Sequence, residues 1–122
     1  MTPRPNWPKI RDALWERAHG RCEVSYQPLD RDTFDAHHRQ NKGMGGTNRA
    51  HRDALSNLLA LDPQVHNGGP LSVHARRVWS GGRGYLVSKL SPHLPAQVPV
   101  LIHGVMWRYL ADDGTYRLEP AL

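Results

Sequence analysis

Phe34-Asp35-Ala36-His37-His38-Arg39-Gln40-Asn41-Lys42-Gly43-Met44-Gly45-Gly46 is the stretch around which this chain is organised. It holds two adjacent imidazoles, then two cations, then a loop with three glycines in four positions. Histidine can bind a metal through a neutral ring nitrogen or accept a proton near neutral pH. The pair His37 and His38 therefore predicts a metal site, a proton-transfer site, or both.

The length and charge of the chain limit the classes of protein to which it can belong. Its 122 residues are the size of one domain, so residues 1–122 are expected to fold as a single unit. The 16 Lys and Arg outnumber the 11 Asp and Glu and give a net charge of +5, which favours a polyanionic partner without establishing one. No apolar run approaches the ~20 residues that cross a bilayer, and residues 1–8 carry no targeting pattern. We therefore expect a cytoplasmic protein with no membrane partner.

Local patterns predict the order of the elements. An extended arm over residues 1–8 precedes an amphipathic helix over 8–19 that ends at Gly20. The patterns then predict a strand over 33–38, a glycine-rich loop over 41–48, a buried strand over 56–61, a helix from Pro70 to residue 79, short strands over 85–87 and 98–102, and a hairpin that joins 106–110 to 116–118 through Asp113-Gly114. This order indicates an α+β fold.

Five side chains that could do chemistry are spread along these predicted elements. In order they are His37, His38, Asn57, His66 and His74. They fall at the end of one strand, at the start of a second, just before a helix and within that helix. A strand pair followed by a helix would allow such distant residues to converge.

At this point the sequence resembles the HNH endonuclease family, which has a ββα-metal (His-Me finger) fold. The resemblance covers about residues 20 to 80 and rests on Arg21-Cys22-Glu23-Val24, His37-His38-Arg39, Lys42-Gly43-Met44-Gly45-Gly46, Asn57-Leu58-Leu59-Ala60-Leu61, His66 and His74-Ala75-Arg76. His-His-Arg followed by Lys-Gly-Met-Gly-Gly is especially similar to small HNH proteins of bacteriophages and prophages. The resemblance implies a ββα-metal core over 20–80, with the amino-terminal helix before it and a β-rich extension over 85–122 after it.

The resemblance also implies a role for each candidate. His38 matches the general base, and Asn57 matches the asparagine that holds the loop and the base in position or, in some members, touches the metal. The implied metal ligands are His37, His66 and His74. His74 fits least well, because eight residues separate it from His66 and one helical turn cannot bring them together. Asp35 is expected either to orient His37 or His38 or to be a solvated carboxylate.

The implied activity is metal-dependent hydrolysis of phosphodiester bonds in DNA, leaving a 5′-phosphate and a 3′-hydroxyl. A cation is required because negative charge develops on the phosphorus oxygens and on the leaving oxygen. The expected cofactor is one divalent ion, with Mg²⁺ or Mn²⁺ first and Ni²⁺ or Zn²⁺ as alternatives. Arg39, Lys42, Arg76 and Arg77 are the candidate contacts to DNA.

One departure from the family pattern concerns stability. Many members carry a zinc ribbon built from two Cys-x-x-Cys pairs, whereas here the corresponding positions read Cys22-x-x-Ser25 and Asp62-x-x-Val65. Three of the four thiolates are absent, so we expect no structural zinc. The apolar core must supply the stability instead.

Two other functions fit the same residues. The first is a non-catalytic nucleic-acid-binding module of a phage DNA-packaging assembly, with packaging proteins as its partners. The second is a small structural protein in which a metal holds the fold. One active site cuts one strand, so a nuclease that cuts both strands would require a homodimer or two successive binding events. The sequence does not decide the oligomeric state, or whether the protein nicks one strand or cuts both.

Overall fold

The computed structural model describes residues 5–40 and 49–120, and it is a mixed α+β fold. Helix α1 (Trp7–Ala18) confirms the helix expected over 8–19. Asn6 caps its first turn by accepting a hydrogen bond from the Lys9 amide, and His19 ends it in the left-handed conformation. The predicted loop over 41–48, with Lys42, lies outside the described residues. Residues 1–4 of the expected arm also lie outside the described residues, and the extended arm is wrong at Trp7 and Pro8, which belong to α1.

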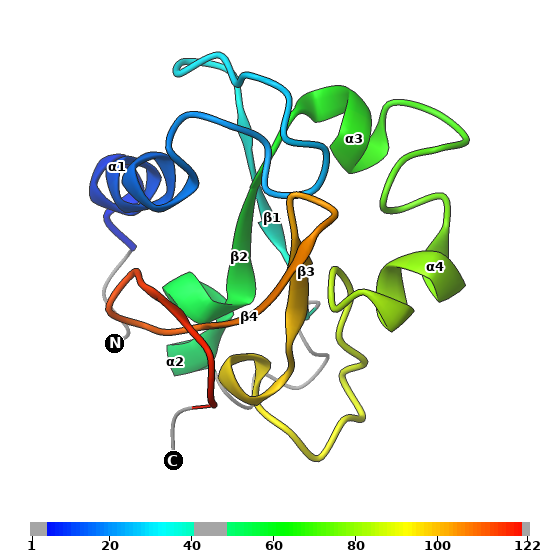
Figure 1. Cartoon of the computed structure of the whole chain (residues 1–122). Helices are drawn as coiled ribbons and strands as arrows, with labels where there is room; N and C mark the ends of the chain where they lie inside the picture. The colour runs from blue at the N-terminus through cyan, green and yellow to red at the C-terminus, as the bar shows by residue number, and fades with distance from the viewer. Residues whose placement is uncertain (1–4, 41–48, 121–122) are drawn as a thin grey trace.

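Two antiparallel strands form the centre of the molecule (Figure 1). Strand β1 (Asp35–His38) pairs with β2 (Leu58–Leu61), and His37 lies opposite Leu59. All four side chains of β2 are buried, as its apolar sequence predicts. The strand begins later than residue 56 because Leu55–Asn57 forms a short 3-10 helix, η1, preceded by α2 (Arg49–Arg52).

The helices after β2 differ from the prediction. Helix α3 (Pro63–Asn67) follows β2 directly, because Asp62 accepts a hydrogen bond from the Gln64 amide and Pro63 suits the first helical turn. The helix expected from Pro70 is wrong over residues 70–76, which form turns. Helix α4 (Arg77–Gly82) begins only after them.

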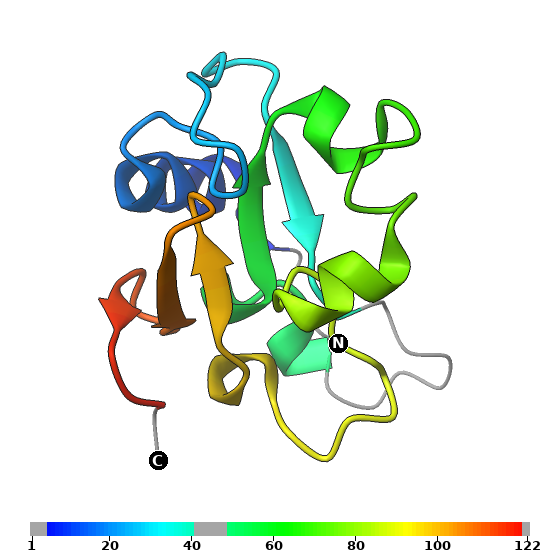
Figure 2. The same ribbon diagram turned by 45° about the vertical axis from the view of Figure 1, so that its right-hand side comes forward.

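A second antiparallel sheet covers one side of the central pair (Figure 2). It consists of β3 (Val100–Ile102), β4 (Met106–Leu110) and β5 (Tyr116–Arg117), and it follows the short 3-10 helix η2 (Pro95–Gln97). The hairpin predicted around Asp113-Gly114 is therefore confirmed. The strand expected over 85–87 is wrong, since Val87 forms only an isolated bridge with Gln40.

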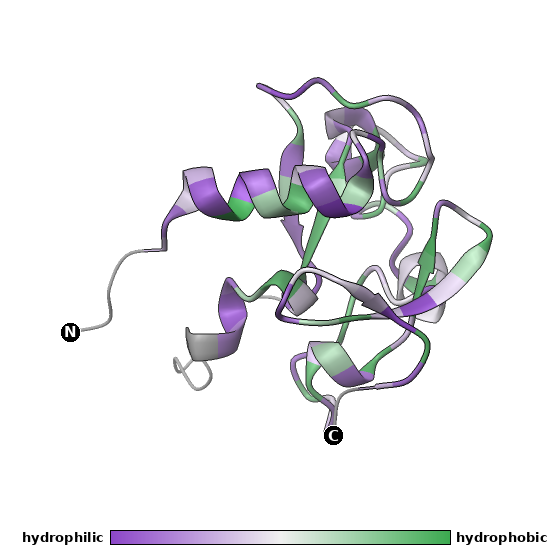
Figure 3. Ribbon diagram, turned by 60° about the vertical axis from the view of Figure 1, so that its left-hand side comes forward, coloured by the Kyte–Doolittle hydropathy of each residue, from purple (hydrophilic) through white to green (hydrophobic). Residues whose placement is uncertain are grey.

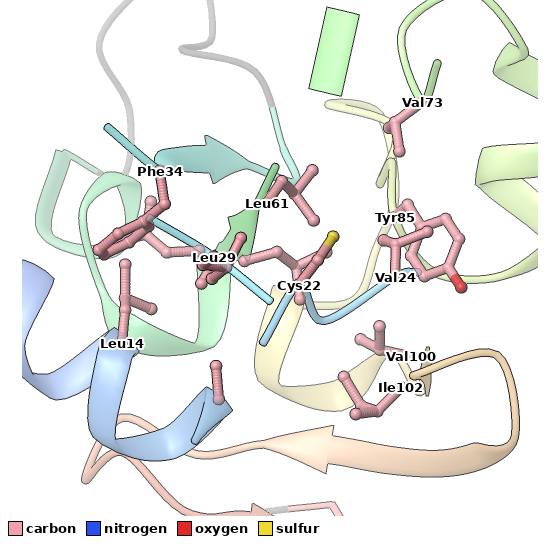
Figure 4. Packing of buried hydrophobic residues seen from close by; sticks show 14 of the residues in the cluster. Leu14, Cys22, Val24, Leu29, Phe34, Leu61, Val73, Tyr85, Val100 and Ile102 are labelled. Atoms are coloured by element: carbon pink, nitrogen blue, oxygen red, sulfur yellow. The ribbon is translucent and has the colours of Figure 1, made fainter. Parts of the chain in front are cut away.

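One hydrophobic core joins both sheets and α1 (Figure 4). Leu14 and Phe34 pack at the α1 side, whereas Tyr85, Val100 and Ile102 pack at the side of the second sheet. Helix α1 carries alternating hydrophilic and hydrophobic bands, as an amphipathic helix should (Figure 3). Among the described residues, no helix combines the length and the apolar character that crossing a membrane requires.

A buried charge network ties three distant segments to this core. The Arg17 guanidinium donates two hydrogen bonds to the Glu23 carboxylate, and neither side chain is more than 1% exposed. The same carboxylate accepts from the Ala60 amide in β2 and from the Tyr116 hydroxyl in β5. Burial and the neighbouring Glu23 charge raise the pKa of Tyr116, so its hydroxyl stays a donor. The network thus joins α1, β2 and β5.

Candidate metal centre

Three of the predicted ligands come together in the structure. One side-chain nitrogen from each of His37, His66 and His74 lies within 4.8 Å of the other two, close enough to hold one metal ion. The rings come from β1, from α3 and from the turn that follows α3. Their centroids are 4.8 to 5.2 Å apart.

His37 presents one nitrogen in the form that binds a metal. Its ring is 1% exposed, and its Nε2 lies 2.6 Å from the Tyr85 carbonyl oxygen, so Nε2 carries the proton and donates. Nδ1 is then a buried acceptor, and it has no hydrogen-bond partner among the described residues. Burial, followed by the nearby histidines, lowers the pKa of His37 to about 3. The ring is therefore neutral, and a metal ion would satisfy the buried Nδ1.

His66 is oriented by a carboxylate on the neighbouring strand. Its Nδ1 lies 2.8 Å from Oδ2 of Asp35, which leaves Nε2 to face the other rings. Asp35 shares a face of β1 with His37, because alternate residues of a strand point the same way. The carboxylate partner expected from the sequence is therefore present, but it orients His66 rather than His37 or His38. Such outer partners fix the ring and increase its basicity as a ligand.

His74 reaches the centre through a chain reversal and not through helical spacing. Its amide donates to the His66 carbonyl oxygen at 3.2 Å, and the Val73 amide donates to the Val65 carbonyl oxygen, so residues 73–74 run beside α3. Glycine is needed at residue 68 because a Cβ there would overlap the Gln64 Cα. His74 Nε2 is 3.1 Å from His66 Nε2. Burial and then His66 lower the pKa of His74, with a smaller contribution from Arg77.

His38 is not one of the three clustered rings. Its Nε2 lies 2.8 Å from Oδ1 of Asp53, just after α2, and its ring meets the Trp7 ring edge-on at 6.0 Å between centroids. Sequence reasoning missed Asp53, because a polar stretch with no periodicity gives no sign of which carboxylate will face a histidine. The arrangement pairs an imidazole with a carboxylate at the end of β1.

Asn57 holds the backbone on both sides of the segment that follows β1. Its Oδ1 accepts from the Gln40 amide at 2.9 Å, and its Nδ2 donates to the Arg52 carbonyl oxygen at 2.8 Å and to the Gln40 carbonyl oxygen at 3.3 Å. The side chain is buried. Its bonds to backbone fit the positioning role expected for Asn57 better than contact with a metal.

The predicted role of Arg39 as a contact to DNA is wrong. It is 1% exposed, and its guanidinium donates to four backbone carbonyl oxygens at 2.7 to 2.9 Å, those of Ser56, Gly84, Pro95 and Val98. Burial lowers its pKa to about 9, which still leaves it charged at neutral pH. Arg39 therefore holds the loops beneath β1 together and is covered from a phosphate.

The two predicted arginines beyond His74 lie at or near the surface. Arg76 stacks on the Trp79 ring, with its guanidinium carbon 3.7 Å from the ring centroid, and Arg77 is exposed. Both therefore remain available to a charged partner.

The donor set indicates what the centre can bind. Three neutral imidazoles suit transition metals, whereas Mg²⁺ prefers oxygen ligands. Because His66 is half-buried and His74 is exposed, such an ion would be accessible from solvent, as in catalytic sites that keep a coordination position open. In comparisons with known proteins, no family model, curated protein or solved structure matches this chain.

Proposed function

We propose that the protein is a metal-dependent DNA endonuclease of the HNH type, with β1, β2 and α3 as its ββα-metal core. The observation that carries the proposal is the cluster of His37, His66 and His74, which residues far apart in the sequence form at the end of this strand pair. A histidine paired with a carboxylate, His38 with Asp53, ends the same strand. A purely binding domain has no need of such a pair beside metal ligands.

The three histidines would hold the ion through His37 Nδ1 and through the nitrogens of His66 and His74 that face it. Imidazole ligands favour Ni²⁺ or Zn²⁺, whereas Mg²⁺ and Mn²⁺ prefer oxygen ligands. When bound, the ion would neutralise negative charge that develops on the phosphate and the leaving oxygen. Asp35 would keep the His66 ring in place.

His38 is the proposed general base. A carboxylate can only accept, so Asp53 fixes the proton on His38 Nε2 and leaves Nδ1 as the basic nitrogen. His38 Nδ1 takes a proton from water, the water oxygen attacks phosphorus, and the bond from phosphorus to O3′ breaks with its electron pair on O3′. Solvent then protonates O3′, which yields a 5′-phosphate and a 3′-hydroxyl. Asp53 also stabilises the imidazolium that forms.

A structural metal site is the second candidate, because the three ligands come from separate segments that an ion would cross-link. A metal that only holds the fold would raise the melting temperature without supporting cleavage. In that case neither the wild type nor a variant without His38 would cleave DNA.

The test uses supercoiled plasmid with Mn²⁺, Ni²⁺ or Mg²⁺ supplied separately, and with a chelator. We expect cleavage only with metal, and about 10²–10⁴-fold slower cleavage by His38→Ala, since that is the usual contribution of a general base. His93→Ala, which removes an exposed histidine on a loop, is the matched control and should cleave normally. Equal nicking by wild type and His38→Ala would refute the assigned base.

A further inference from the structure

The net positive charge of the chain comes from one segment, residues 63–111. Residues 63–111 contain no Asp or Glu, but they contain five of the Lys and Arg residues, Arg76, Arg77, Arg83, Lys89 and Arg108. These five account for the whole net charge of +5, because the other eleven Lys and Arg are balanced by the eleven Asp and Glu. Two of the three clustered histidines, His66 and His74, belong to this acid-free segment.

Two of these arginines lie over the Trp79 ring of α4, and a third lies on the same helix. The guanidinium carbons of Arg76 and Arg83 lie 3.7 and 4.5 Å from the Trp79 ring centroid, and Arg83 also donates to the Trp79 carbonyl oxygen. Arg77 is exposed on the same helix. We call Arg76, Arg77 and Arg83, together with Trp79, the arginine face.

Among residues 5–40 and 49–120, no carboxylate pairs with the cations of the arginine face. The six ion pairs of the described residues include none of the three arginines, and Arg76 Nε is a buried donor without an acceptor there. Asp35, the carboxylate at the histidine centre, is engaged by His66. Stacking restrains a guanidinium while its edge remains able to donate, so little further order is lost when it meets an anion.

The arginine face is joined to the histidine centre by short contacts. The Ser80 hydroxyl in α4 donates to the Val73 carbonyl oxygen, next to His74. The Tyr85 amide donates to the Ser80 carbonyl oxygen, and the Tyr85 carbonyl oxygen accepts from His37. His74 and Arg77 are both exposed and only three residues apart, so an anionic chain at the His74 ring would lie near the arginine face.

We propose that the arginine face binds the phosphate backbone of duplex DNA next to the histidine centre, and that Arg83 is a DNA-contacting residue that the sequence motifs did not indicate. This inference rests on DNA as the proposed substrate. Guanidinium groups bind phosphate through paired N–H donors, and each neutralised phosphate adds about 0.9 to the steepness with which affinity falls with salt.

The experiment measures binding apart from cleavage. All proteins carry His38→Ala, so that a short fluorescent DNA duplex stays intact, and the dissociation constant is measured by anisotropy over a range of salt. Arg77→Gln/Arg83→Gln should make the log–log slope shallower by about 2 and weaken binding. Arg31→Gln/Arg117→Gln is the control, because it removes the same charge from exposed arginines that are paired with Asp12 and Asp113. The control should leave the slope unchanged.

Two further variants distinguish the loss of a charge from a loss of folded structure. Arg77→Gln alone changes an exposed side chain and should reduce the slope by about 0.9. Arg77→Lys/Arg83→Lys keeps the charge and should keep most of the slope. An unchanged slope in the double Gln variant, or an equal change in the control, would overturn the inference even if the wild type cleaves DNA. A protein that shows the expected slopes but never cleaves would retain the arginine face and lose the nuclease proposal.

Discussion

Metal binding at the three histidines should stabilise the fold by an amount that His74 controls. A metal present at a hundred times its dissociation constant stabilises a protein by about 2.7 kcal/mol if it binds only the folded state. For a chain of 122 residues, 1 kcal/mol corresponds to a change of about 4 °C in melting temperature. The expected rise is therefore about 10 °C.

His74→Ala is the perturbation of choice because the side chain is exposed, so its loss should cost the metal-free protein little. Loss of an outer partner of a ligand weakens metal binding about 10–100-fold, so loss of a ligand should weaken it at least 100-fold. At the same metal concentration only about 0.4 kcal/mol of stabilisation would remain, which corresponds to a rise of about 2 °C.

The assay is thermal unfolding with and without Mn²⁺, Ni²⁺ or Zn²⁺, and the quantity compared is the rise caused by metal. His93→Ala serves as the control and should keep the full rise. An equal rise in wild type and His74→Ala would place the ion elsewhere. No rise with any of the three metals would refute the centre as a metal site.

Three further predictions concern the base, the buried network and pH. Asp53→Asn should lower the single-turnover cleavage rate at least about 10²-fold without changing DNA affinity, because it no longer fixes the His38 tautomer; an unchanged rate would remove Asp53 from catalysis. Glu23→Gln should cost about 3–5 kcal/mol in urea unfolding and Tyr116→Phe only about 1.5–3 kcal/mol, since the first leaves a buried cation unpaired; equal losses would contradict this account. The pKa of His37 is about 3 in the folded protein against an ordinary value near 6.5, so between these values only the unfolded chain binds the proton. The stability of the metal-free protein should therefore rise with pH over that window by up to about 1.4 kcal/mol per unit from this group, and His37→Gln should show a flatter rise.

Several features of the structure could be predicted from local sequence patterns. Helix α1 and strand β2 follow from apolar periodicity and from a continuous apolar run, and the hairpin follows from Asp113-Gly114. The clustering of His37, His66 and His74 agrees with the ligand set that the family resemblance implied.

Other features depended on tertiary contacts that no local pattern records. Asp62-Pro63 is a helix start signal, but it directly follows an apolar run, so the same residues also fit the end of a strand. His74 could not be placed from its eight-residue spacing, because a chain reversal and not a helix returns it to His66. The sequence also does not distinguish a buried arginine such as Arg39 from one that meets a phosphate, since its four carbonyl partners lie far along the chain.

The Glu23 carboxylate has a consequence for where the protein can be shortened. It binds a side chain from α1, an amide of β2 and a hydroxyl near the carboxyl end in β5. A fragment cut to residues 20–80 would retain all three clustered histidines, yet it would lose Arg17 and Tyr116 and leave a bare anion in the interior beside β2. Side chains from α1 and from the tail after residue 85 thus both help to hold the strand pair, and the smallest stable fragment must include both.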